Sequence, residues 1–318
     1  MPFVTARSEQ GSWIVGVGGL RGGTVIYDPS TNEAFPGPRY QAHARRAHPI
    51  SLQGKVYAIS RHPSVRYKSK FDFEPWFESL SFRKGAPCIY GDDCPYWKTL
   101  PPPPFFPCLL DPMEFRNPPS ISVSSYAAFG SHILLSLDCK EMGTYAFDVV
   151  KKTWEKVCNE SLPFVGQAVH LGGSLFVACS TTQHNVTPPA ALFHMSITSS
   201  STLAASGKLT TNLLSVLEYP VAAEGDPLPL FCSMGKGSFC SISLGSCRQI
   251  HEGSDDTQII LTSFEIQNVE AILASFQTES AKAKDLQVPV QVKHQNQIYK
   301  LHGPFKNLPM PVIASLSM

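Results

Sequence analysis

Short runs of alternating apolar and polar residues recur along the chain, separated by turns rich in Gly, Ser and Asn. In the clearest copy, residues 130–157, a Gly-Ser turn leads into the apolar run Ile133–Leu137, then into Thr144–Asp148 and on to Trp154. A period of two places successive side chains on opposite faces of a strand. Each copy therefore predicts a hairpin followed by a third strand.

The same turn recurs with its own apolar runs at several points of the sequence. The turns lie at Gly11, Gly54, Gly130, Gly172 and Gly235, with a weaker sixth in Gln295–Leu301. Small units of this kind cannot cover both of their apolar faces alone, so repetition indicates a circular array in which neighbours cover one another. The predicted fold is all-β, a β-propeller of about six blades, within a range of five to seven.

The third strand of a unit ends in an acidic turn in two copies, Thr24–Asp28 and Thr144–Asp148. Because Asp28 and Asp148 occupy equivalent repeat positions, we expect them to accept backbone N–H bonds in turns rather than to form an acid/base pair. Trp154 follows on the next strand, where its indole is expected to fill the wedge between two blades.

Residues 1–318 are expected to form one domain whose extra length lies in loops. Inserted loops are predicted near 61–97, 101–119, 196–212 and 277–287, although Trp76–Phe82 within the first is expected to form a strand. Val269–Leu286 is ambiguous, because Ile266, Val269, Leu273 and Phe276 fit a helical period, yet Ala271–Phe276 also fits a strand. Because the repeat demands strands on both sides, the strand is preferred, with a last hairpin made by Val288–His294 and Ile298–Leu301.

These units resemble the kelch repeat, in which an apolar strand ends in a Gly pair and is followed by a Tyr-Asp strand and then a Trp. The matching positions, expected to have structural roles, are Gly18, Gly19, Tyr27, Asp28, Trp97, Tyr145, Phe147, Asp148 and Trp154. The resemblance implies that the propeller is kelch-like.

Three segments, Tyr27–Thr31, Trp97–Phe105 and Gly143–Val157, look like a family of uncharacterised plant proteins, expanded in grasses, with kelch-like or F-box-associated propellers. This resemblance implies a propeller of unassigned role, sometimes coupled to ubiquitin-ligase assembly. An F-box would be an N-terminal helical segment with a Leu-Pro opening, whereas this sequence has strand pattern from Phe3. Direct binding to a Skp-type adaptor is therefore not expected.

The composition agrees with a fold of many turns and few helices. Charged residues make up 16% of the chain, which contains 27 Pro and 22 Gly. A formal charge of +1 gives no bulk attraction to nucleic acid or to an anionic membrane. With no signal peptide or membrane span in the sequence, we expect a soluble protein of the cytoplasm, the nucleus or both. The nine cysteines show no zinc-type spacing and are expected to be reduced core residues.

No motif in the sequence assigns a catalytic residue, a cofactor or a metal ligand. The glycines of residues 16–23 could suggest a phosphate loop, but that loop must open a helix and Thr24–Tyr27 is strand-like, so a turn is expected. The ten histidines, among them His48, could form a metal site only through tertiary contacts that the sequence does not show.

Two segments outside the repeats have alternative interpretations. Basic residues interleaved with aromatics in 61–97 could bind single-stranded nucleic acid, but an inserted loop is preferred and nucleic-acid binding is not expected. Pro101–Pro104 could be a polyproline ligand for SH3 or WW domains, but a stiff connection between blades is preferred.

Two functions are therefore weighed. The first is a non-catalytic protein-interaction module whose loops contact an unidentified protein partner, with a basic contact surface at Arg39, Arg45, Arg46, Arg61 and Arg66. The alternative is an enzyme, an oxidase or hydrolase, that uses the propeller channel. A third interpretation is a fragment or paralogue whose partner module lies on another chain.

Overall fold

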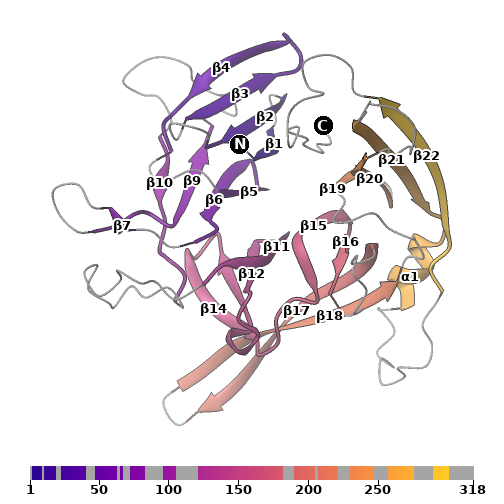
Figure 1. Ribbon diagram of the computed structural model, residues 1–318. Helices are drawn as coiled ribbons and strands as arrows, with labels where there is room; N and C mark the ends of the chain where they lie inside the picture. The colour runs from indigo at the N-terminus through magenta and orange to yellow at the C-terminus, as the bar shows by residue number, and fades with distance from the viewer. Residues whose placement is uncertain are drawn as a thin grey trace. The chain divides into compact units, whose positions relative to one another are not determined.

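The computed structural model describes residues 2–8, 11–18, 23–40, 47–62, 65–66, 72–82, 96–104, 121–181, 190–204, 207–220, 230–235, 237–246, 257–275 and 289–300 (Figure 1). The chain divides into two compact units, unit 1 over residues 1–162 and unit 2 over residues 163–317. The single domain predicted over 1–318 stays a prediction.

Unit 1 contains three groups of four antiparallel strands. The first has the order β1-β2-β3-β4 and comprises β1 (Phe3–Ser8), β2 (Gly11–Val17), β3 (Thr24–Asp28) and β4 (Glu33–Gly37). The second has the order β5-β6-β9-β10 and comprises β5 (Ala47–Leu52), β6 (Lys55–Ser60), β9 (Phe77–Ser81) and β10 (Lys98–Thr99). The third comprises β11 (Val123–Phe129), β12 (His132–Leu137), β13 (Thr144–Asp148) and β14 (Thr153–Cys158).

Two short elements lie between the strands of unit 1. The hairpin of β7 (Val65–Arg66) and β8 (Asp72–Phe73) separates β6 from β9, and a 3-10 turn, Lys140–Met142, separates β12 from β13. The strand β9 confirms the one expected within Trp76–Phe82.

Unit 2 continues the same pattern with two further groups of four antiparallel strands. The first comprises β15 (Phe164–Gly172), β16 (Leu175–Ser180), β17 (Ala190–Ala204) and β18 (Gly207–Pro220). The second comprises β19 (Leu230–Gly235), β20 (Ser238–Ser246), β21 (Thr257–Ile266) and β22 (Val292–Lys300), with helix α1 (Val269–Ser275) between β21 and β22. The fold is all-β, and the described part of the chain contains five such groups.

Three expectations about the second half of the chain are wrong. Residues 269–275 form helix α1, because Val269, Ile272 and Leu273 share one helical face and pack against the core of unit 2. Of the segment 196–212, residues 196–204 lie in β17 and residues 207–212 in β18, which pair from Ala191↔Pro220 to Ala204↔Gly207, so a loop over these residues is wrong. The final hairpin is instead the single strand β22, paired with β21 along its whole length. The predicted loops near 101–119 and 277–287 lie mostly or wholly outside the described residues.

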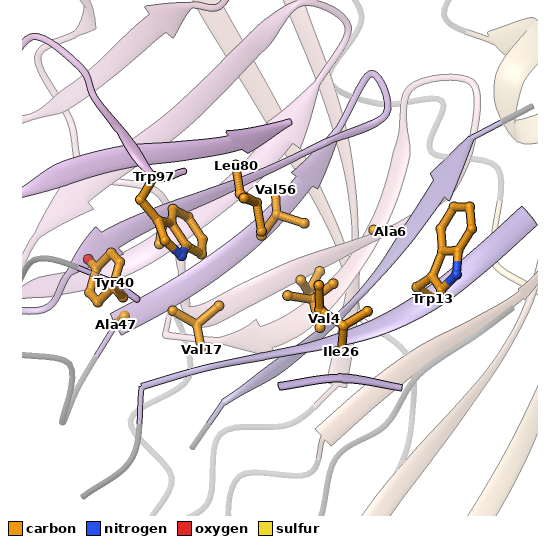
Figure 2. Packing of buried hydrophobic residues seen from close by; sticks show 12 residues of the cluster. Val4, Ala6, Trp13, Val17, Ile26, Tyr40, Ala47, Val56, Leu80 and Trp97 are labelled. Atoms are coloured by element: carbon orange, nitrogen blue, oxygen red, sulfur yellow. The ribbon is translucent and has the colours of Figure 1, made fainter. Parts of the chain in front are cut away.

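Buried apolar clusters hold neighbouring groups of unit 1 together. The first joins β1–β4 to β5–β10, and Figure 2 shows Trp97 beside Tyr40 within it, with ring centroids 5.1 Å apart. The second joins β5–β10 to β11–β14. There the Trp154 ring lies 5.0 Å from Phe147 and 5.4 Å from Phe77, and its Nε1 donates to the Pro101 carbonyl at 2.9 Å. Trp154 thus packs where the second and third groups of unit 1 meet.

The acidic turns also behave as the repeat predicts. Asp28 accepts bonds from the Ser30 N–H at 2.8 Å and the Ser30 hydroxyl at 2.6 Å, and these bonds lower the pKa of the carboxyl. Asp148 accepts the N–H groups of Val150 and Lys151 at 2.9 and 3.0 Å. Burial raises the pKa of Asp148, but these bonds and nearby His132 outweigh burial and lower it. Both aspartates close turns.

No helix among the described residues is long and apolar enough to cross a membrane.

Candidate functional site

The leading end of unit 1 is the end at which β1, β5 and β11 begin and β2, β6 and β12 end. The backbone links its parts: Val123 N–H, at the start of β11, donates to the Arg61 carbonyl, just past the end of β6, at 3.1 Å. Trp97 Nε1 donates to Thr24 Oγ1, at the start of β3, at 3.0 Å. Connections between strands and between groups therefore gather here.

Two of the five predicted partner-binding arginines, Arg39 and Arg61, are exposed at this end. Their chain neighbours are joined, because the buried Tyr40 hydroxyl and the Ser60 hydroxyl lie 3.3 Å apart at hydrogen-bond distance. Arg66 lies in β7 and its side chain is not among the described ones, whereas Arg45 and Arg46 lie outside the described residues.

The segment that carries Arg61 is anchored at both ends. Besides the bond from Val123, His62 Nδ1 lies 3.2 Å from the Ile121 carbonyl oxygen. The next residue along, Ser122, donates its N–H to Asp138 Oδ1 at 2.8 Å. Burial raises the pKa of Asp138, but the Ser122 bonds outweigh it and His62 adds to them, so the pKa is lowered. The Arg61 backbone is thus fixed between β6 and β11 while its side chain reaches solvent.

A polar cluster that sequence reasoning missed lies beneath the two arginines. Glu74 and Glu78 are buried, at 8% and 0% exposure, and Trp76 Nε1 donates to the Ser60 carbonyl. Burial, and then the charges of Glu78 and Glu74, raise the pKa of Tyr40 above its usual range, although the Ser60 bond opposes the rise. The Tyr40 phenol therefore stays neutral and holds residues 39 and 60 together. The positions of Tyr40, Ser60, Glu74 and Glu78 in the sequence do not indicate that these residues lie together in the fold.

His48 is a second group that the sequence could not single out. It lies on β5, its ring 4.7 Å from the Tyr126 ring of β11. Its Nε2 atom is enclosed and has no hydrogen-bond partner within the described residues. Burial, and then the positive charges of Arg61 and His62, together lower the pKa of His48 to about 4, so the imidazole is neutral at pH 7.

We expect acid to destabilise unit 1 through His48. Unfolding returns its pKa to about 6.5, so its contribution is complete above pH 6.5 and is lost as the pH falls towards 4. The linkage predicts a loss of about 2 kcal/mol in the free energy of unfolding between pH 7.5 and pH 5. Urea unfolding followed by Trp fluorescence reports this unit, because all four tryptophans lie in it.

The matched variants for this pH prediction are His48→Phe, which keeps a ring against Tyr126, and His62→Gln, which changes an exposed histidine of the same unit. His48→Phe should reduce the pH dependence by about 2 kcal/mol, whereas His62→Gln should retain most of it. An equal pH dependence in wild type and His48→Phe would contradict the assignment.

The glycine-rich segment at this end is not a phosphate loop of the strand–loop–helix kind. Gly18 N–H donates to the Gly23 carbonyl at 3.0 Å, which closes a turn, and the chain continues directly into β3. Gly19 lies outside the described residues. The described part of the chain contains no group of three or more His, Cys, Asp or Glu side chains placed to hold a metal ion.

The fold and this end together define a class: an all-β protein of repeated four-strand antiparallel groups with basic residues on connections at one end of unit 1. Residues 1–299 match a family described as "Protein of unknown function (DUF1668)", and the chain belongs to that family. No curated protein matches the chain. The kelch and F-box-associated resemblances stay predictions.

Proposed function

We propose that this protein is a non-catalytic interaction module, built on a kelch-like β-propeller, that binds an acidic protein surface through the leading end of unit 1. We infer a recognition role of the kind found among F-box and kelch proteins. The observation that carries the proposal is the presentation of exposed Arg39 and Arg61 on a backbone fixed by the Tyr40–Ser60 and Val123–Arg61 hydrogen bonds.

A fixed backbone matters because binding costs free energy when loops must be ordered. Arg61 is presented from a segment already bonded to β11, so less ordering remains when its guanidinium meets a carboxylate. Arginine forms planar, bidentate bonds with carboxylates and is enriched among the residues that dominate protein interfaces. Arg39 and Arg61 are both exposed and positively charged, which favours an anionic partner.

The all-β construction supports the same role. The apolar clusters between the groups of unit 1 cover the sheet faces, and this leaves strand ends and connections to contact other molecules. Asp28 and Asp148 accept hydrogen bonds within turns, and the Tyr40–Ser60 hydrogen bond links the two segments that carry Arg39 and Arg61.

Charge reversal of Arg39 and Arg61 together tests the proposal. Partner proteins would be captured from cell extract on immobilised wild type, Arg39→Glu/Arg61→Glu and Lys55→Glu, and quantified by mass spectrometry. Lys55 is the matched control, because it is exposed at the opposite end of the strand that leads to Arg61. The double variant should lose acidic partners by at least about tenfold, and Lys55→Glu should change recovery by less than about twofold.

Added salt should weaken wild-type capture, since exposed charges are screened. Recovery of the same proteins at the same level on wild type and on the double variant would refute this binding surface. So would failure of wild type to recover any protein above the bare support.

An enzymatic role is the second candidate, and the enclosed Nε2 of His48 is the observation that favours it. A neutral imidazole with an unused nitrogen can act as a general base, and a substrate would have to open the packing around Nε2 to reach it. Metal analysis of purified protein, and comparison of hydrolase and oxidase activities of wild type and His48→Phe, would test this role. Equal activities would remove His48 from it.

A further inference from the structure

The hairpin of β17 and β18 is longer than the strand beside it. β16 pairs with β17 only from Cys179↔Ala190 to Leu175↔His194. β17 and β18 pair with each other from Ala191↔Pro220 to Ala204↔Gly207, and Figure 1 shows them as one long hairpin that extends past β16. Most of this ribbon therefore has no third strand from the described residues of unit 2.

The outer edge of the ribbon is β18, which is the last strand in its sheet. Natural edge strands usually carry charges, prolines or bulges that prevent another strand from pairing with them. Residues 209–217 read Leu-Thr-Thr-Asn-Leu-Leu-Ser-Val-Leu and contain no charge and no proline. Leu213 and Leu217 are 54% and 45% exposed. Residues 209–217 of β18 therefore lack the charges and prolines that usually prevent another strand from pairing with an edge.

The sequence of β18 is self-complementary about Leu213. Its two charged residues, Lys208 and Glu218, stand five positions to either side of Leu213, and Leu209 and Leu217 stand four positions to either side. An antiparallel copy in this register would place Lys208 opposite the partner's Glu218 at both ends. It would also place Leu217 opposite the partner's Leu209.

We propose that a second copy of this chain pairs with β18 in antiparallel orientation, with a two-fold axis at Leu213. In this register odd-numbered residues face odd-numbered residues of the second copy, and even-numbered residues face even-numbered ones. The backbone N–H and C=O groups of β18 that point away from β17 therefore face the same groups of the second copy and can form hydrogen bonds with them. Residues 209, 213 and 217 share one face of a strand. The exposed Leu213 and Leu217 of each copy therefore lie on one face of the shared sheet.

Charge explains why a second copy is favoured over an unrelated peptide. A β18 edge with one positive and one negative end attracts an antiparallel copy of itself at both ends, and cross-strand pairs of opposite charge stabilise a sheet. Glu218 Oε1 also accepts a hydrogen bond from the Ser180 hydroxyl, which ties this part of β18 to β16. This surface lies in unit 2 and is independent of the proposed partner surface.

Sedimentation equilibrium of the purified chain tests the dimer. Wild type should dimerise, and Leu213→Lys should raise the dimer Kd by at least about 30-fold, because two like charges would face each other at the axis. Val150→Lys is the control, since Val150 is 69% exposed in a turn of unit 1 and should leave the Kd unchanged. Circular dichroism would confirm that each variant is folded.

Two further measurements test the register. Lys208→Glu should weaken the dimer, and Lys208→Glu combined with Glu218→Lys should restore it. Leu213→Cys should give, on mild oxidation, a covalent dimer whose peptide map shows a disulfide between the two copies of position 213, a link distinct from any formed by the exposed Cys139 of wild type, because residues facing across the axis lie within disulfide reach. A monomeric wild type at about 100 μM would overturn the proposal. So would a dimer unaffected by Leu213→Lys, or one in which neither restoration nor cross-linking occurs.

Discussion

Replacing Gly143 with Ala should destabilise unit 1 by about 4 kcal/mol or more, enough to prevent a marginally stable unit from folding. Gly143 has φ +75° and ψ −154°, a backbone conformation that residues with a side chain rarely adopt. A Cβ built there would lie 2.3 Å from the Cys158 carbonyl oxygen and 2.9 Å from the Asn159 carbonyl oxygen. Because both atoms belong to the backbone, neither can move without shifting the chain after β14.

Gly130→Ala is the matched control for this steric effect. Gly130 also has a positive φ, +60°, in a turn of the same four-strand group, but a Cβ added there would meet no atom within 4 Å beyond its chain neighbours. It should cost about 1 kcal/mol, the usual penalty for a side chain in that region. Urea unfolding followed by Trp fluorescence measures both variants. Equal losses in the free energy of unfolding for the two variants would show that the contact with the Cys158 and Asn159 carbonyl oxygens is not the reason why position 143 requires glycine.

Phe77→Ala should lower the free energy of unfolding of unit 1 by about 3–5 kcal/mol. Phe77 is fully buried on β9, and its ring lies 4.8 Å from Phe147, 5.4 Å from Trp154 and 6.0 Å from Tyr57. Truncation removes the ring that joins two four-strand groups and leaves a cavity between them. Trp154 fluorescence should also change in the folded state, because the indole loses an aromatic neighbour.

Tyr96→Ala is the control for Phe77→Ala, since Tyr96 is an aromatic residue just before β10 that is 71% exposed. It should change the free energy of unfolding by less than about 0.5 kcal/mol. A loss below about 1 kcal/mol for Phe77→Ala would mean that the packing between the second and third groups contributes little to the stability of unit 1.

The strands of unit 1 were predictable because their signal is local. Alternation and turn residues in 130–157 predict β12, β13 and β14, and each is present. The same local chemistry identified Asp28 and Asp148 as turn acceptors, because an aspartate reaches N–H groups only two or three residues ahead.

The errors fall where two local patterns compete. The apolar residues of this short run are compatible with a helix and with a strand. The helix α1 forms because it buries one face, made by Val269, Ile272 and Leu273, against the core of unit 2. The Ser- and Thr-rich segment 196–212 has the composition of a loop, but β17 and β18 pair in a register that continues from residues anchored by β16. Strand pairing at long range overrode composition.

The sequence by itself determined the all-β class, the strands that end in acidic turns, and the absence of a recognisable catalytic motif, since each depends on residues close together in the chain. Only the tertiary structure decided which polar groups meet. Tyr40 reaches Ser60, Arg61 bonds Val123 and His48 stacks on Tyr126 because strands distant in sequence pack side by side, and spacing along a chain does not report that packing.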